Sequence, residues 1–315
     1  MALVGRFDII DRFAVGGMAD IFRARDTRDN SPVVIKRLRA DRQSQPDAVR
    51  AFHQEIEIHL LMQHPNIVRA VEAGSLGDRE HLVLEFVAGH TLADIMERAG
   101  QVNATLPHAF ALYIVAELLG ALHHAHTLAV DGMPLGIVHR DVTPRNVFIS
   151  YDGQVKLADF GAVRSARNQK QEAVMFGSPG YLSPEQAEQS ALDCRSDVFA
   201  VACILLELLT GQRALDVAHL PDSEVLSVHK NPRILLDTNL PDDVVTTIAR
   251  ATATSARARH PDALAMELEV RESLAALNLP VDHRAMKLLT RTLFRREYAA
   301  SFVPPLPRQD VSPHS

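Results

Sequence analysis

Two short polar segments of this chain place oxygen-bearing side chains at a spacing that suits phosphate chemistry. Asp141 and Asn146 stand five residues apart, and Asp159 follows Asp141 by 18 residues. Asp141 is a candidate base for a hydroxyl group, whereas Asn146 and Asp159 are candidate ligands for Mg²⁺ on the phosphates of a nucleotide. Each segment alone, 139–146 or 159–161, is short enough to recur by chance. Together, each beside a short apolar run, they predict a site for phosphoryl transfer.

Length and composition allow a sizeable core. The chain has 315 residues, of which 47% are apolar, and this fits one large domain or two modest lobes. A net charge of −6 argues against electrostatic binding of nucleic acid. The two cysteines, Cys194 and Cys203, lie in an apolar segment and are expected to be buried thiols of a reducing cytosol.

The sequence patterns argue against a signal peptide and a membrane span. Residues 1–6 lack a long apolar core, and the apolar stretch 109–130 is interrupted by Glu117 and by histidines. The stretch 198–209 is shorter than the roughly 20 residues that cross a bilayer. We therefore expect a soluble, cytoplasmic protein without a transmembrane segment.

Short strand-like runs dominate the first part of the chain, and longer helical periodicities follow them. Strands are expected at Phe7–Phe13, Ala19–Arg25, Pro32–Arg37, Val68–Ala73 and His81–Phe86, with a helix at Pro46–Gln63. Further helices are expected at Ala109–Ala129, Asp197–Thr210, Asp243–Ala253 and Pro261–Ala276. Pro261 suits the first turn of the last of these.

This pattern predicts four regions. They are a strand-rich lobe over 1–87, a helical lobe over 88–278, an amphipathic helix over 279–302 and a proline-rich tail over 303–315 that is expected to be disordered. In the amphipathic helix the apolar side would consist of Leu288, Leu289, Leu293 and Phe294, opposite a basic side of Arg284, Lys287, Arg291 and Arg295. The helix either packs on the large lobe with a solvated basic face or docks on a partner or a membrane surface.

The segments 139–146 and 159–161 resemble the catalytic loop and the metal-binding loop of eukaryotic-like (Hanks-type) bacterial serine/threonine protein kinases. The resemblance covers residues 7–276, and a polar insertion over 130–136, expected to be a surface loop, is similar to those of myxobacterial members. It implies an α+β, bilobal kinase fold, with a small antiparallel β-sheet lobe that holds one helix and a larger helical lobe. It also implies ATP and Mg²⁺, with Mn²⁺ as an alternative metal, and protein substrates.

The small lobe resembles the nucleotide-binding lobe of kinases. In the turn 14–21 only Gly16 keeps the position of a family glycine, since Ala14 and Ala19 replace the other two. Val34 stands where the family usually has alanine against the adenine. The residues that the resemblance places around the nucleotide are Val15, Gly16, Gly17, Ile21, Val34, Lys36, Glu55, Leu84, Glu85, Val87 and Phe148.

Lys36 ends the apolar run 33–36 and, by resemblance, reaches the α- and β-phosphates, for which it needs a carboxylate to hold it. Glu55 is the expected partner because it lies nine residues before His64, where the helix-ending signature of many kinases begins. Glu57 would point about 200° away around the helix and is expected to be solvated. Leu84 is expected at the rear of the pocket.

By resemblance, Asp141 is the catalytic base, Lys36 steadies the phosphates, and Asn146 and Asp159 bind the metal. Thr143 departs from the family, in which a lysine at this position usually faces the γ-phosphate. Arg145 either replaces that lysine or is a surface arginine, and the sequence leaves both interpretations open.

The segment 177–185 resembles the one that shapes the acceptor site in kinases. Ser178 is expected to reach Asp141, which would favour Ser/Thr acceptors over tyrosine. Glu185 is expected to be buried against Arg259. Asp197 would hold the backbone of the catalytic loop, cap its own helix, or do both.

Arg140 precedes the candidate base, and kinases with an arginine there are often activated by a phosphate on the loop that follows Gly161. Residues 166–177 contain no Ser, Thr or Tyr. Glu172 is therefore expected either to pair with Arg140 and order the loop without phosphorylation or to be a solvated charge.

The leading hypothesis is an ATP- and Mg²⁺-dependent Ser/Thr protein kinase of bacterial signalling, with autophosphorylation. The alternative is a pseudokinase scaffold, suggested by the changes in the turn 14–21 and at Thr143. All five residues with direct chemical roles are present, which argues against that alternative. A small-molecule phosphotransferase is disfavoured by the peptide-shaping segment 177–185. The C-terminal helix and the proline-rich tail are candidate docking sites for a partner.

Overall fold

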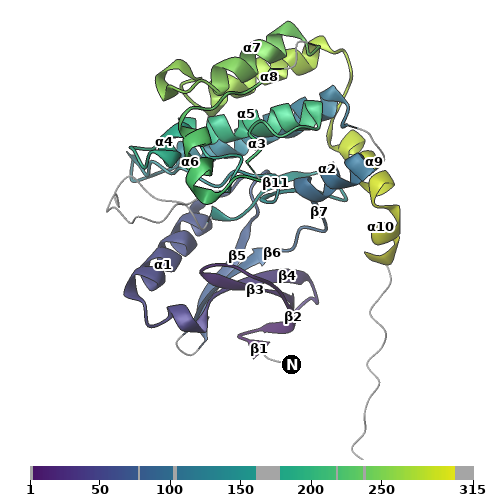
Figure 1. Ribbon diagram of the computed structural model, residues 1–315. Helices are drawn as coiled ribbons and strands as arrows, with labels where there is room; N and C mark the ends of the chain where they lie inside the picture. The colour runs from purple at the N-terminus through teal and green to yellow at the C-terminus, as the bar shows by residue number, and fades with distance from the viewer. Residues whose placement is uncertain are drawn as a thin grey trace, which may run out of the picture.

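The computed structural model describes residues 3–76, 79–101, 105–160, 178–217, 219–236 and 239–301. These residues form a sheet-rich small lobe and a helical large lobe, which Figure 1 shows in the lower and upper parts of the view. The expected α+β, bilobal architecture is confirmed. The proline-rich tail over 303–315 lies outside the described residues.

The small lobe is built on an antiparallel sheet with the strand order β1-β2-β3-β4-β6-β5. Its strands are β1 (Leu3–Val4), β2 (Phe7–Val15), β3 (Ala19–Asp26), β4 (Pro32–Leu38), β5 (Ala70–Leu76) and β6 (Arg79–Glu85). The five predicted strands correspond to β2 to β6, with ends shifted by a few residues. β1, with only two residues, was too short for a period-of-two pattern to predict.

The helix α1 (Pro46–Leu61) packs on this sheet. Pro46 occupies the first turn, where a proline's fixed φ fits and its missing N–H costs no hydrogen bond. Phe52, Ile56 and His59 recur at three- and four-residue intervals and are buried, so this face of α1 lies toward the interior. The chain leaves the helix at Met62, which has an extended backbone.

The large lobe surrounds two apolar helices, α3 (His108–His126) and α5 (Arg195–Thr210). Both are apolar on nearly all sides, and such helices lie in an interior. In Figure 1, α7 (Asp242–Ala251) and α8 (Ala263–Ala276) form the layer beyond α5. The shorter helices are α2 (Leu92–Gln101), α4 (Pro184–Ala187) and α6 (Asp222–Lys230).

A second, three-stranded sheet lies where the two lobes meet. Its strands are β7 (Gly89–Thr91), β10 (Val147–Ser150) and β11 (Val155–Leu157), in the order β11-β10-β7. A side chain at Gly89 would stand 2.1 Å from the carbonyl oxygen of Ile149, so this crossing requires glycine. The backbone N–H of Leu157 donates to Asn66 O, and that of Val68 donates to Leu157 O, which ties the large lobe to the end of α1.

Several local predictions need correction. Pro261 precedes the N-cap Asp262 of α8, whose carboxylate accepts from Ala265 N, so the proline lies outside the helix. The insertion 130–136, expected as a loop, contributes to an exposed two-stranded hairpin of β8 (Ala129–Val130) and β9 (Met133–Pro134). Cys203 is fully buried as expected, but Cys194 is partly exposed at the start of α5.

The single amphipathic helix predicted over 279–302 is two helices, α9 (His283–Leu293) and α10 (Arg295–Ser301). Asp282 caps α9 by accepting from two backbone N–H groups, and Phe294 interrupts the helical backbone. Phe294 is 2% exposed, as expected for the apolar side. Leu288, assigned to the same side, is 70% exposed, so that assignment was wrong.

The two C-terminal helices pack against the large lobe near its junction with the small lobe (Figure 1). The Phe294 ring stacks on His90 of β7 with a centroid distance of 3.5 Å, and the guanidinium of Arg98 lies over the same Phe294 ring, 4.7 Å from its centroid. Arg98 also donates to Glu297 at 2.6 Å, and Arg291 donates to the carbonyl oxygen of Tyr151 at 2.8 Å. Of the two alternatives for this region, packing on the large lobe is the one that the structure shows. Its basic side is not fully solvated, however, because Arg291 is bound to the lobe.

Within the described part of the chain, no helix combines the length and apolar character that crossing a membrane requires.

Candidate active site

Lys36 lies in an ion-pair network at the junction of the lobes. β4 presents its side chain toward α1, where Nζ lies 2.5 Å from Glu55 Oε1 and 2.8 Å from Asp159 Oδ1. Burial lowers the pKa of the Lys36 ammonium, but the carboxylates of Glu55 and Asp159 outweigh burial, so the pKa is raised above its usual value. Lys36 is therefore a fixed positive charge.

The choice of Glu55 over Glu57 as the partner of Lys36 is correct. The Glu55 side chain is 3% exposed, and Glu57, two residues along the same helix, is exposed. Among the described residues, Glu55 Oε2 has no hydrogen-bond partner, although it is buried. Such an orphaned acceptor leaves the carboxylate available only to cations or to donors that enter the site.

The turn between β2 and β3 is tight. The N–H of Gly16 donates to Ala19 O at 2.9 Å, and a side chain at Gly16 would stand 3.0 Å from the same oxygen. Gly17 has open space where a side chain would be. Val15 is half-exposed at the end of β2, and Ile21 pairs with Lys36 across β3 and β4. The predicted phosphate turn therefore has little room for a side chain at Gly16, and it lies beside the strand of Lys36.

An apolar patch lies beside Lys36. Val34 pairs with Leu84 across β4 and β6, and both pack in one cluster with Val87 and Ala158. Phe148 of β10 is partly exposed and pairs with Thr91 and Lys156. Such a patch with a lysine at its edge fits a flat base joined to phosphates.

Glu85 is one of the residues that the sequence analysis placed around the nucleotide. Its side chain accepts from Lys156 Nζ at 2.7 Å and from Arg69 N at 2.9 Å, and its own N–H donates to Arg69 O. The Glu85 side chain therefore anchors the segment between the lobes, and Val87, two residues later, packs in the same cluster as Val34.

The catalytic loop adopts a backbone that only a supporting contact makes stable. Arg140 has φ 70°, in the left-handed region that costs about 1–2 kcal/mol for a residue with a side chain. Asp197, 1% exposed in α5, accepts from the backbone N–H groups of His139 and Arg140, each at 2.8 Å. The expected support of the loop by Asp197 is thus present, whereas the N-cap position of α5 belongs to Cys194.

His126 completes this support and was not predicted. Its Nε2 lies 2.8 Å from Asp197 Oδ2. Burial raises the pKa of Asp197, but the hydrogen bond from His126 and the neighbouring backbone donors outweigh burial and lower it overall. A histidine in an otherwise apolar helix was the available signal, since such a buried polar group requires a partner.

Asp141 is oriented by two neighbours. Asn146 Nδ2 donates to the backbone oxygen of Asp141 at 2.8 Å and to Asp141 Oδ2 at 3.1 Å. Ser178 donates to Asp141 Oδ1 from its hydroxyl at 2.8 Å and from its backbone N–H at 2.9 Å. The expected contact of Ser178 with Asp141 is therefore confirmed, and the carboxylate has a fixed direction.

The segment that contains Ala158 and Asp159 is hydrogen-bonded directly to the loop 139–146. The N–H of Ala158 donates to Asn146 O at 2.8 Å, and His139 Nε2 lies 3.1 Å from Ala158 O. Asp159 has φ 62°, a second left-handed residue at this junction. Asn146 and Asp159, 13 residues apart in sequence, thus come from adjoining backbone.

Phe160 fixes the far side of this loop. Its buried ring makes edge contacts with His139, at a centroid distance of 4.6 Å, and with His59 of α1, at 5.6 Å. Burial lowers the pKa of His59 to about 4, so the imidazole is neutral at pH 7 and its Nε2 donates to Val68 O at 2.7 Å. The sequence analysis missed His59, because its pattern on α1 is that of any core position.

The residues around Asp159 fit a Mg²⁺ ion shared with a nucleotide. Among the described residues there is no group of three or more His, Cys, Asp or Glu side chains that could hold a metal alone. Mg²⁺ is usually held by one or two protein oxygen ligands together with substrate phosphates. Asn146 and Asp159, with Lys36 beside them, match that donor set.

A buried ion pair fixes the segment that ends at Glu185. Arg259 donates to both carboxylate oxygens of Glu185, at 2.7 and 2.8 Å, and its side chain is fully buried. Ser196 also donates to Glu185, at 2.6 Å. Burial raises the pKa of Glu185, but the bonds from Arg259 and Ser196 outweigh burial and lower it. The predicted pair is confirmed.

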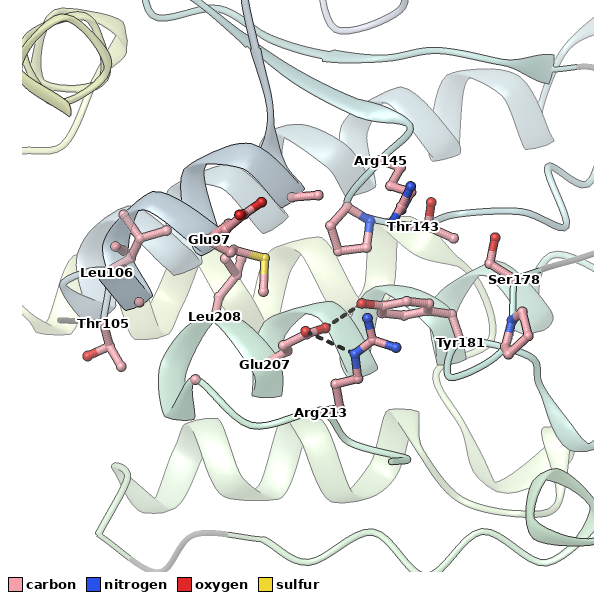
Figure 2. A pocket seen from close by; sticks show the side chains of 17 residues that line it. Glu97, Thr105, Leu106, Thr143, Arg145, Ser178, Tyr181, Glu207, Leu208 and Arg213 are labelled. Carbon is pink, nitrogen blue, oxygen red and sulfur yellow. Dashed lines mark hydrogen bonds and ion pairs between the residues drawn. The ribbon is translucent and has the colours of Figure 1, made fainter. Parts of the chain in front are cut away.

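A cavity of about 790 Å³ opens beside the Asp141–Ser178 contact (Figure 2). It is lined by α2, the catalytic loop, residues 178–181 and the end of α5. Thr143 is buried in its wall, and Arg145 is exposed and lines it. The structure therefore places Arg145 on the side of the acceptor segment.

The expected pairing of Arg140 with Glu172 falls on residues that the structure does not describe, since 161–177 lie outside the described ranges.

The fold and the site together define the class of bilobal phosphotransferases. The strand-rich lobe carries Lys36 paired with Glu55, and the helical lobe carries the loop of Asp141 and Asn146. The model of the protein kinase domain matches residues 7–278, and the chain belongs to this family. Similar curated proteins include the probable serine/threonine-protein kinase PknB of Lactococcus lactis, 34% identical over 85% of this chain and 42% of that protein. PknB of Mycobacterium leprae is 37% identical over 67% of this chain and 33% of that protein.

A third relative, the tyrosine-protein kinase MasK of Myxococcus xanthus, is 32% identical over 82% of this chain and 41% of that protein. The chain thus covers between a third and a half of these three relatives. The relatives confirm the expected membership of the Hanks-type bacterial kinases.

Proposed function

We propose that this chain transfers the γ-phosphoryl group of ATP to Ser or Thr hydroxyls of proteins, including its own. One observation supports the proposal most directly. The ion pairs that join Lys36 to Glu55 and Asp159 adjoin the loop in which Asn146 and Ser178 orient Asp141. Positioning and charge are what phosphoryl transfer chiefly requires of a protein.

Each side chain has a distinct task in this reaction. Lys36, held by Glu55, supplies a positive charge for the non-transferred phosphates. Asp141 orients the acceptor hydroxyl and takes its proton. Asn146 and Asp159 would hold Mg²⁺. When bound, the metal supplies positive charge that offsets the charge of the phosphates.

The acceptor class rests on Ser178, whose hydroxyl lies on Asp141. The names of two PknB relatives support Ser/Thr transfer, whereas the name of MasK supports tyrosine as the second candidate. The pseudokinase alternative draws no support from these comparisons. The proposal also includes a cytoplasmic location, where ATP is available. It keeps the region boundaries at 87/88 and 278/279.

The proposal is tested with purified chain, radiolabelled ATP and a generic basic protein, in parallel with Mg²⁺, with Mn²⁺ and with EDTA. Label should appear on serine and threonine in the presence of metal and disappear with EDTA. Lys36→Met and Asp141→Asn should each lower the rate at least a hundredfold, about 2.7 kcal/mol of transition-state stabilisation.

Two glutamates of α1 provide a matched pair. Glu55→Gln should lose most activity because Lys36 loses its anionic partner, and Glu57→Gln, on the exposed side, should retain it. Label found on tyrosine alone would assign the second acceptor class. Wild-type activity no greater than that of Asp141→Asn would refute phosphotransfer.

A further inference from the structure

The cavity beside Asp141 and Ser178 is the place where a protein substrate would lie, so an inference about it rests on the proposed function. Its volume of about 790 Å³ falls in the range of roughly 300–1,000 Å³ found for binding pockets. It is therefore large enough for several residues of an extended segment. The charges that line it should decide which segments fit.

Glu207 lies largely buried in the wall of this cavity, where it pairs with Arg213. Its side chain is 12% exposed, its Oε2 accepts from Tyr181 OH at 2.5 Å, and its Oε1 lies 3.8 Å from Arg213 Nε. Burial and the nearby carboxylate of Glu207 raise the pKa of Tyr181, so the phenol keeps its proton and remains a donor. Both oxygens of Glu207 are thus committed to neighbours within the wall.

The terminal guanidinium nitrogens of Arg213 are available to donate to a bound segment. Its side chain is 46% exposed, and only Nε faces Glu207. Nη1 lies near the backbone of Gly180, 3.7 Å from where a side chain of that glycine would be, and no hydrogen bond from its terminal nitrogens is found within the described ranges. In Figure 2 the Arg213 guanidinium stands beside the Tyr181 ring, in the same half of the view as Ser178.

Arg145 supplies a second guanidinium on this side. It is exposed, and it has neither an ion pair nor a side-chain hydrogen bond to any residue that the structure describes. Figure 2 shows it next to Thr143, in the half of the view that also holds Ser178 and Arg213. This side of the cavity therefore presents two arginines: Arg145, which has no ion pair with a described residue, and Arg213, which faces Glu207 through Nε alone.

The opposite part of the cavity differs. Leu106 and Leu208 line it, and the exposed Glu97 lies on the same side (Figure 2). An arginine or lysine next to the acceptor would meet Arg145 and Arg213, whereas an acidic residue would meet two donors suited to a carboxylate.

We propose that Arg145 and Arg213 make this chain select acceptor segments with an aspartate or glutamate within a few residues of the phosphorylated Ser or Thr. The occupant of the cavity is thus an acidic, extended segment of a protein. Partly exposed arginine–carboxylate pairs contribute modestly, so we expect a preference of about tenfold in kcat/KM when both arginines act.

The test uses alanine-based peptides with one serine and a single Glu or a single Lys at each position from four residues before it to four after. For wild type, the Glu peptide should exceed the Lys peptide about tenfold in kcat/KM at one or more positions. Arg145→Glu should reverse this ratio at that position, and Arg213→Gln should reduce it severalfold. Arg50→Glu, a charge change on the exposed face of α1, should leave the ratio unchanged.

Each other outcome has a defined meaning. Equal rates for Glu and Lys peptides in wild type would overturn this inference and leave the proposed function standing. A uniform fall in kcat for all peptides in Arg145→Glu, with an unchanged ratio, would assign Arg145 to the phosphoryl group and also overturn the inference. No transfer to any peptide or to the basic protein would overturn the proposed function and the inference together.

Discussion

Replacing Glu185 by alanine would leave the guanidinium of Arg259 buried without its carboxylate. Arg259 has a fully buried side chain, makes two short bonds to Glu185 and lies over the ring of Phe199 at 4.9 Å. Removing one partner of such a pair costs about 3–5 kcal/mol, because the remaining charge can neither reach water nor find an anion. Ser196 would lose its acceptor as well.

That cost translates into a measurable shift of the melting temperature. With about 2.1 cal/mol/K per residue, the 315 residues have an unfolding entropy near 0.7 kcal/mol/K, so a loss of about 4 kcal/mol lowers Tm by about 6 °C. Scanning calorimetry without nucleotide would measure it. Glu185→Gln, which keeps the shape but not the charge, should shift Tm by nearly as much.

The exposed pair Arg50–Asp47 is the control, since both side chains are 69% exposed. Arg50→Ala should lower Tm by less than about 1.5 °C, because exposed ion pairs contribute about 0–1 kcal/mol. If Glu185→Ala shifted Tm no more than Arg50→Ala does, the reasoning that the buried charge stabilises this segment would be refuted.

Two further predictions concern His59 and Phe294. Burial lowers the pKa of His59 from 6.5 to about 4, so between these pH values the unfolded chain binds a proton that the folded chain excludes. About 3 kcal/mol of stability that is present above pH 6.5 should therefore be lost as the pH falls toward 4. In urea unfolding at a series of pH values, His59→Leu should flatten that slope relative to wild type, and an unchanged slope would contradict the assignment. Phe294→Ala should destabilise the chain by about 3–5 kcal/mol, because the ring is 2% exposed and lies between His90 and Arg98. The control Leu288→Ala, at a 70% exposed position of α9, should change the free energy of unfolding by no more than about 0.5 kcal/mol. Equal effects of the two variants would show that α9 and α10 are not docked as described.

The predictions that succeeded depended on patterns within short stretches of chain. The strands β2 to β6 and the helix α1 were found because side chains alternate with a period of two in a strand and recur every three or four residues in a helix. The helices α3 and α5 were found because long apolar runs must be buried. The ends moved by one to three residues, since the last turn of a helix depends on caps such as Asp262.

The predictions that failed concerned segments whose structure depends on distant residues. The region 279–302 reads as one amphipathic helix, but Phe294 leaves the helical backbone where its ring meets His90, some 200 residues earlier. The insertion 130–136 pairs with itself as a hairpin, for which its two-residue strands gave too little pattern.

By itself the sequence determined the chemical groups of the site, because Asp141, Asn146 and Asp159 lie in two loops whose spacing is fixed along the chain. Through the resemblance to kinases it also indicated Glu55 as the partner of Lys36, because Glu55 lies nine residues before His64, where the helix-ending signature begins. Only the tertiary structure decided that His59 closes on Phe160, that His126 supports Asp197, and that Arg145 and Arg213 line one side of the same cavity. These residues lie tens to a hundred positions apart in the sequence. The packing of the helices and of the two lobes, rather than any local pattern, determines which of them come together.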